Sequence, residues 1–113
     1  MIVKKYKIYS DLTNELVGNI YLNDNGKYTM ENIVQNGAKP SLFRLREDLW
    51  KDPERVHMIA EDWLNRRVVP RNRVGLMPLL KEIYGIDYYD RDFLITKNKG
   101  RVVTDCYRVE IED

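Results

Sequence analysis

The sequence predicts an α+β fold in a single domain spanning residues 1–113, because strand-like and helix-like patterns succeed one another along the chain. The first third alternates β-branched and aromatic residues with turn clusters, the middle has two stretches with helical apolar spacing, and the last segment alternates again. A chain of 113 residues has the length of one domain. We therefore expect an N-terminal antiparallel β-meander, two to three helices including a helix-turn-helix-like pair, and a C-terminal β-hairpin.

The meander is predicted by three short runs that are rich in β-branched and aromatic residues. The first two runs, 2–8 and 16–22, are separated by a turn cluster at 10–14. The third run, 27–34, follows the turn 23–26, in which an Asn-Gly pair tolerates the positive φ angles of a tight hairpin. Three consecutive strands joined by short turns favour an antiparallel meander.

The middle of the chain predicts a clear helix over residues 53–67. Asp52 is a good N-cap, and Pro53 suits the first helical position, where its missing N–H costs nothing. The apolar residues that recur with helical spacing are Val56, Ile59, Ala60, Trp63 and Leu64. Residues 41–50 could form a further short helix before it.

A second helix is predicted over residues 74–84, after Pro70 has ended the first one. The same apolar spacing recurs in Leu76, Leu79, Leu80, Ile83 and Tyr84. Gly85 is a natural C-terminal stop. The two helices and the short join between them predict the helix-turn-helix-like pair.

The C-terminal hairpin is predicted over residues 93–111. Residues 93–95 form a short apolar run, and residues 97–100 form a turn that ends in glycine. Within 107–111 apolar residues alternate with charged ones, as in a half-buried strand.

Composition and motifs argue against an enzyme, a cofactor and a membrane partner. The single histidine, His57, and the single cysteine, Cys106, have no sequence neighbours that would complete a metal site or activate a nucleophile. There is no glycine-rich phosphate loop. Lysines interrupt the apolar stretch Met1–Ile8, so we expect neither a signal peptide nor a membrane span there. A lone cysteine fits a reducing compartment, and we expect a cytoplasmic protein.

Seven basic residues are the candidate binding residues. Four of them lie at the join between the two predicted helices, namely Arg66, Arg67, Arg71 and Arg73. The other three lie at the tip of the predicted hairpin, namely Lys97, Lys99 and Arg101. In a winged-helix protein such residues would contact DNA phosphates and guanine edges. The net charge of only +1 argues against a phosphate-dominated binder. The arginines can equally pair with Glu61, Asp62 or Glu82, or bind a protein partner. We favour the protein partner and keep DNA as the alternative.

The spacing around the join also resembles a known family. Trp63-Leu64 is followed at fixed spacing by Arg67, Val69-Pro70, Arg73 and Gly75-Leu76. This pattern resembles the N-terminal region of HipA-like proteins of Gram-positive bacteria and their mobile elements, in which a tryptophan-bearing helix ends in Arg-x-Ile-Pro and Arg-x-Gly-Ile precedes a leucine-bearing helix.

A later segment is similar to the same family. Residues 95–107 resemble the family's glycine turn and its Leu-Ser-Asp-x-Tyr-Trp-Ile segment, except that Arg108 stands where the family has tryptophan. The similarity covers residues 55–111, about half of the chain.

The resemblance implies a regulatory module that packs on a kinase-like core in proteins of that family. The sequence reaches Asp113, where the kinase-like domain would begin, so no ATP-binding or catalytic residue is carried over. The resemblance therefore implies a non-enzymatic, antitoxin-like or inhibitory partner that acts in trans on a kinase-like protein, in a bacterial or phage toxin–antitoxin or defence context. It implies no cofactor.

Overall fold

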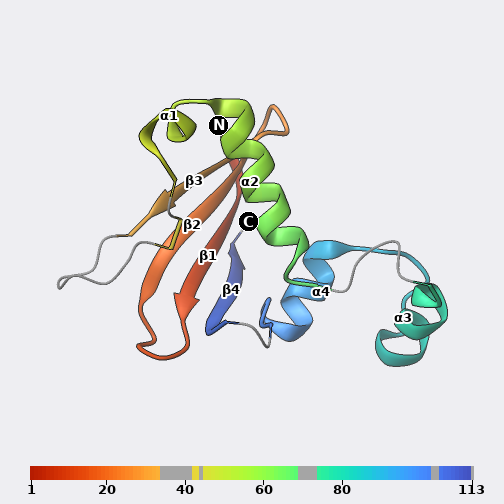
Figure 1. Ribbon diagram of the computed structural model, residues 1–113. Helices are drawn as coiled ribbons and strands as arrows, with labels where there is room; N and C mark the ends of the chain where they lie inside the picture. The colour runs from red at the N-terminus through yellow and green to blue at the C-terminus, as the bar shows by residue number, and fades with distance from the viewer. Residues whose placement is uncertain (34–41, 44, 69–73, 103–104, 113) are drawn as a thin grey trace.

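A computed structural model shows an α+β protein, as the sequence predicts (Figure 1). It describes residues 1–33, 42–43, 45–68, 74–102 and 105–112. The elements, in chain order, are β1 (Ile2–Ser10), β2 (Leu16–Asn23), β3 (Tyr28–Asn32), α1 (Glu47–Trp50), α2 (Pro53–Asn65), α3 (Leu76–Tyr84), α4 (Arg91–Asn98) and β4 (Tyr107–Glu112).

The four strands form one antiparallel sheet in the order β3-β2-β1-β4. The predicted meander is therefore confirmed, and the C-terminal strand returns to pair with the N-terminal one. In this register Tyr6 of β1 lies between Ile20 of β2 and Ile111 of β4. The two strands from opposite ends of the chain are neighbours at the centre of the molecule (Figure 1).

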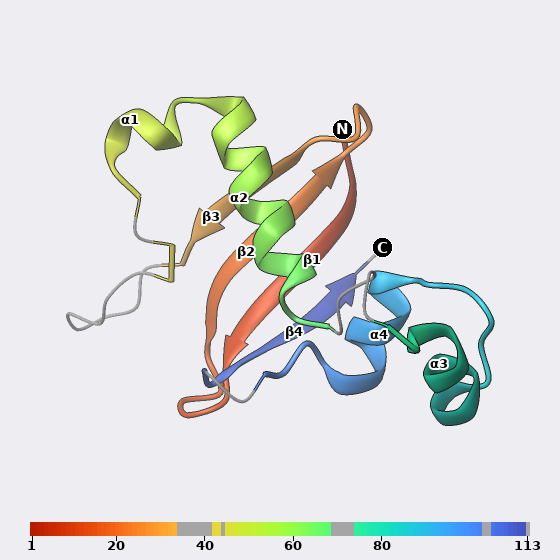
Figure 2. The same ribbon diagram turned by 45° about the vertical axis from the view of Figure 1, so that its right-hand side comes forward.

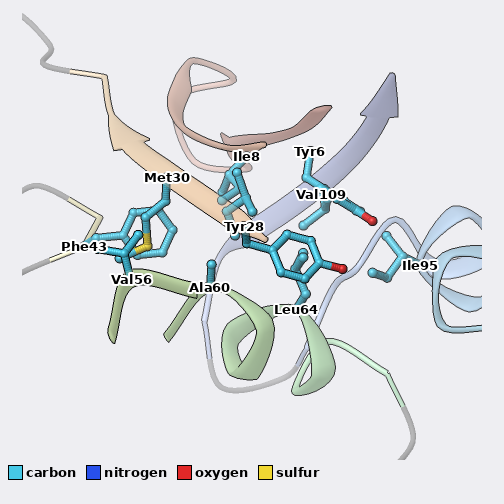
Figure 3. Packing of buried hydrophobic residues seen from close by; sticks show 11 residues of the cluster. Tyr6, Ile8, Tyr28, Met30, Phe43, Val56, Ala60, Leu64, Ile95 and Val109 are labelled. Atoms are coloured by element: carbon cyan, nitrogen blue, oxygen red, sulfur yellow. The ribbon is translucent and has the colours of Figure 1, made fainter. Parts of the chain in front are cut away.

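Helix α2 lies across one face of this sheet in both views of the ribbon (Figures 1 and 2). The side chains between them form the main core: Tyr6, Ile8, Ile20, Tyr28, Met30, Phe43, Val56, Ala60, Leu64, Ile95 and Val109 (Figure 3). Alternate residues of β1 point to this face, because successive side chains of a strand point to opposite faces. Tyr6 and Ile8 are fully buried, whereas Lys5 and Lys7 lie on the other face, away from α2.

Helix α2 starts where the sequence predicts it. The carboxylate of Asp52 accepts a hydrogen bond from the backbone N–H of Arg55, and Pro53 opens the helix. The helix ends two residues earlier than predicted, and Arg66 is its C-cap. Among the described residues of the ambiguous segment 41–50, Glu47–Trp50 form helix α1.

Helix α3 packs in a second, smaller hydrophobic cluster, which we call the α3 core. It consists of Leu76 and Leu80 of α3, Leu94 of α4, and Ile86. The glycines at both ends of the helix, Gly75 and Gly85, have positive φ angles of 75° and 71°. Gly85 ends the helix, as predicted. Both views show α3 standing at the side of the molecule, away from the sheet (Figures 1 and 2). The predicted turn between α2 and α3 falls mostly on residues outside the described ranges.

The predicted C-terminal hairpin is wrong in its first half, because residues 93–95 belong to helix α4. The carboxylate of Asp90 accepts the backbone N–H of Phe93 at 3.1 Å and so caps this helix. Leu94 then faces the α3 core and Ile95 the main core, so two adjacent apolar residues are buried on different sides. A run of three apolar residues has no periodicity that separates a strand from a helix. The strand β4 pairs with β1 instead.

Candidate functional site

Among the described candidate residues, Arg67 is the one that the fold holds most firmly. Its side chain is 5 % exposed, and its two Nη atoms donate to the two carboxylate oxygens of Asp105 at 2.8 and 2.6 Å. The guanidinium also lies 3.9 Å from the centre of the Trp63 ring. Burial acts to raise the pKa of Asp105, but the hydrogen bonds from Arg67 and from the backbone of Tyr107 outweigh it and lower that pKa. Arg67 thus ties the end of α2 to the start of β4.

Arg66, in contrast, points to solvent. Its Nε lies 2.8 Å from a carboxylate oxygen of Asp62, one turn back in the helix, and the two side chains are 78 % and 62 % exposed. Such an exposed pair contributes little to stability and leaves the guanidinium accessible. Arg71 and Arg73 lie outside the described residues.

The three basic residues of the predicted hairpin tip lie instead at the end of α4 and just beyond it. The amine of Lys97 lies 5.2 Å from the ring centre of Phe93, and the backbone carbonyl of Lys99 accepts the N–H of Val109 at 2.6 Å. Arg101 reaches back to Asp11 with two hydrogen bonds of 2.9 and 3.2 Å. The described members of the predicted site are therefore spread over the ends of two helices, and two of the arginines hold internal carboxylates.

Asp11, in the turn between β1 and β2, receives a second arginine. Arg108 donates to it at 2.9 Å, and the hydrogen bonds from Arg101 and Arg108 lower the pKa of Asp11 to about 2. Arg108 is therefore an ion-pair partner of the turn between β1 and β2.

Sequence reasoning missed a pocket of about 870 Å³ between the end of α2 and the start of α4. Its lining combines charged, amide and apolar side chains: Glu61, Asn65, Arg66, Val68, Tyr89, Asp90, Arg91 and Asp92. Of the predicted site's described members, Arg66 lines it.

A polar network joins this pocket to the main core. Arg91 donates to Asn65 at 3.0 Å and to the hydroxyl of Tyr28, while Asp92 accepts from Lys4 at 2.7 Å and from the hydroxyl of Tyr6 at 2.9 Å. Figure 3 shows both tyrosine hydroxyls on the side of the core where Ile95 of α4 packs. The partners of Arg91 and Asp92 are up to 88 residues away in the chain, so no local motif could have indicated this network.

The network keeps its groups in their ordinary charge states. Burial, followed by the charge of Asp92, raises the pKa of Tyr6, so its hydroxyl stays protonated. No group of three or more histidine, cysteine or carboxylate side chains within the described ranges is placed to hold a metal ion. Because the donors and acceptors of this network are matched to one another, it can orient α4 and shape the pocket wall.

A group of exposed apolar residues belongs to α3 and its flanks. We call this set the α3 surface: Val74, Met77, Ile83 and Tyr88, which are 98 %, 40 %, 59 % and 53 % exposed. Val68 and Tyr89 line the pocket and also pack against the α3 core, so the pocket adjoins that core. Exposed apolar side chains gathered on one element mark an interaction surface more often than scattered ones do.

Within the described ranges, no helix combines the length and the apolar character needed to cross a membrane. Comparison of the chain with models of protein families, with curated proteins and with solved structures finds no significant match.

Proposed function

We propose that this protein is a non-enzymatic protein-binding module that docks on another protein through the α3 surface. The resemblance to the N-terminal region of HipA-like proteins suggests a kinase-like protein as the partner. The module would act on it in trans as an antitoxin-like or inhibitory subunit, in the cytoplasm of a bacterium that carries a toxin–antitoxin or phage-defence locus.

The observation that carries this proposal is the incomplete burial of the α3 stripe. Leu76 and Leu80 are 3 % and 1 % exposed, whereas Ile83 on the same apolar stripe is 59 % exposed. The fold therefore covers only part of a stripe that the sequence makes apolar. Burying a fully exposed side chain of this size contributes about 1.5 to 3 kcal/mol, and covering the part of Ile83 that is still exposed would contribute about half of that.

The character of α3 also favours a protein partner over DNA. The charged residues of this helix are one lysine, Lys81, and one glutamate, Glu82, so it offers no excess of positive charge to phosphates. The wing that a winged-helix protein would place on DNA is replaced by helix α4. DNA binding remains the alternative, since Arg71 and Arg73 lie outside the described residues.

The experiment compares two substitutions of equal exposure. Ile83→Asp puts a charge on the α3 surface, and Met58→Asp does so on α2, where Met58 is also 59 % exposed. Binding to a HipA-like protein from the same bacterial host is measured by calorimetry. We expect the unmodified protein and Met58→Asp to bind alike and Ile83→Asp to lose at least about tenfold in affinity.

Two outcomes would contradict the proposal. The first is no binding of the unmodified protein to the kinase-like protein. The second is binding to duplex DNA at low salt with a steep salt dependence, which would favour the DNA alternative.

A further inference from the structure

The edge strand β3 presents the backbone N–H of Tyr28 to a side chain instead of to another strand. Hydrogen bonds at both ends of the strand run from Asn23 N to Lys27 O and from Ile33 N to Val17 O. They show that the odd-numbered residues direct their backbone N–H and C=O groups toward β2. The N–H of Tyr28 therefore points away from the sheet. It donates to Nδ1 of His57 on α2 at 3.0 Å.

The second ring nitrogen of His57 is engaged too. Nε2 lies 3.1 Å from a carboxylate oxygen of Glu61, one turn along α2. The ring stacks on that of Tyr28, with centroids 5.5 Å apart and planes inclined by 14°, and the side chain is 15 % exposed. Only the neutral imidazole with its proton on Nε2 can accept from Tyr28 and donate to Glu61 at the same time.

We propose that His57 is an acid-sensitive latch between α2 and the edge of β3. Protonation adds a second hydrogen to the ring, and this hydrogen sits on Nδ1. Two donors, Nδ1–H of His57 and the backbone N–H of Tyr28, then face each other. The latch opens, and the edge of β3 at Tyr28 loses its acceptor. An unsatisfied edge N–H is a group that another strand can bind.

The charged groups around the His57 ring act in opposite ways on its protonated form. Glu61 favours the protonated ring, but its side chain is 47 % exposed, so the pair gains little. On the far side of Tyr28, the guanidinium of Arg91 lies 5.5 Å from the tyrosine ring centre and opposes a second positive charge. Lys27, next to Tyr28, carries a positive charge that its ion pair with Glu54 offsets.

The opposite edge of the sheet gives an internal reference. There the N–H of Val109 donates to the backbone carbonyl of Lys99 at 2.6 Å, and that of Tyr107 donates to the carboxylate of Asp105 at 3.1 Å. A carbonyl does not titrate, and Arg67 holds the pKa of Asp105 below its ordinary value. Mild acid therefore acts on the β3 edge and leaves the β4 edge closed.

The test is made by NMR on the unmodified, ¹⁵N-labelled protein. Long-range ¹H–¹⁵N correlations report the tautomer of His57, which we expect to carry its proton on Nε2. Amide exchange is followed at about pH 7.5 and about pH 5, on either side of the range in which free imidazole titrates. After correction for intrinsic exchange, protection at Tyr28 should fall about tenfold in acid, the effect of losing one hydrogen bond, while protection at Val109 stays unchanged.

His57→Asn is the matched variant, because the asparagine Oδ1 occupies the place of Nδ1 and does not titrate. We expect Tyr28 in this variant to stay protected at both pH values. A proton on Nδ1 in the unmodified protein, equal loss of protection at Tyr28 and Val109, or the same acid response in His57→Asn would each overturn the latch. The first two readouts use the unmodified chain and do not depend on the folding of the variant.

Discussion

The main core and the α3 core of this protein differ in how completely they cover the helix they hold. Helix α2 is packed in the main core with side chains from all four strands and from α4. Helix α3 is anchored mainly through Leu76 and Leu80, whereas Met77 and Ile83 of the same helix are 40 % and 59 % exposed. A helix with few buried contacts opens more easily than one that is part of the central core. The sheet and α2 therefore form the more completely packed part of the fold, and α3 carries the exposed apolar side chains on which the proposed docking depends.

The largest expected effect comes from matched leucine truncations in the two cores. Leu64 and Leu80 are 0 % and 1 % exposed, so Leu→Ala removes equally buried methyl groups. We expect Leu64→Ala to lower the free energy of unfolding by about 3 kcal/mol, because it leaves a cavity between α2 and the sheet. Leu80→Ala should lower it by about 1 kcal/mol and speed amide exchange within α3 only. Equal losses in chemical denaturation would show that α3 is an integral part of the fold.

The next effect concerns the link between α2 and β4. Arg67→Ala leaves Asp105 without its guanidinium, and we expect a loss of about 2 kcal/mol in chemical denaturation. This is less than for a fully buried pair, because the Asp105 side chain is 27 % exposed. Arg66→Ala is the control, since its pair with Asp62 is exposed and should change stability by less than about 0.5 kcal/mol. Similar losses from both variants would refute the structural role of Arg67.

A smaller effect is expected from the network that joins β1 to α4. Burial acts to raise the pKa of Asp92, but the hydrogen bonds from Lys4 and Tyr6 and the charge of Arg91 outweigh it and lower that pKa. A lowered carboxylate pKa in the folded state stabilises the protein above the ordinary aspartate range, and this contribution is lost as the pH falls through the folded-state value. Asp92→Asn should cost about 1 kcal/mol at neutral pH and flatten the loss of stability below about pH 4. An unchanged acid branch in thermal melts would contradict this.

The smallest effect on stability is expected on the α3 surface. Ile83→Asp should change the free energy of unfolding by less than about 0.5 kcal/mol, because the side chain is already largely in water. A clear loss of stability in chemical denaturation would mean that Ile83 supports the α3 core, and the contrast between a packed and a displayed helix would disappear.

Local chemistry was enough to predict most elements. The Asn-Gly turn predicted the hairpin between β2 and β3, Asp52 and Pro53 predicted the start of α2, and Gly85 predicted the end of α3. These residues act on the backbone within a few positions, so their effect can be read along the chain. The segment 93–95 was misassigned because its burial in two separate cores depends on where α3 and β1 lie.

The sequence by itself determined the alternation, the helical stripes and the caps, and through them the α+β class of this protein. Only the tertiary structure decided the partners of its charged side chains. Asp105 lies 38 residues from Arg67, and Asp92 lies 86 residues from Tyr6, so no spacing rule connects them. A salt bridge or a buried hydrogen bond depends on distances of a few ångströms in space, which the packing of strands and helices sets after local propensities have chosen the elements. The same packing buries Leu76 and Leu80 but leaves Ile83 of the same apolar stripe exposed, which the spacing along the chain does not indicate.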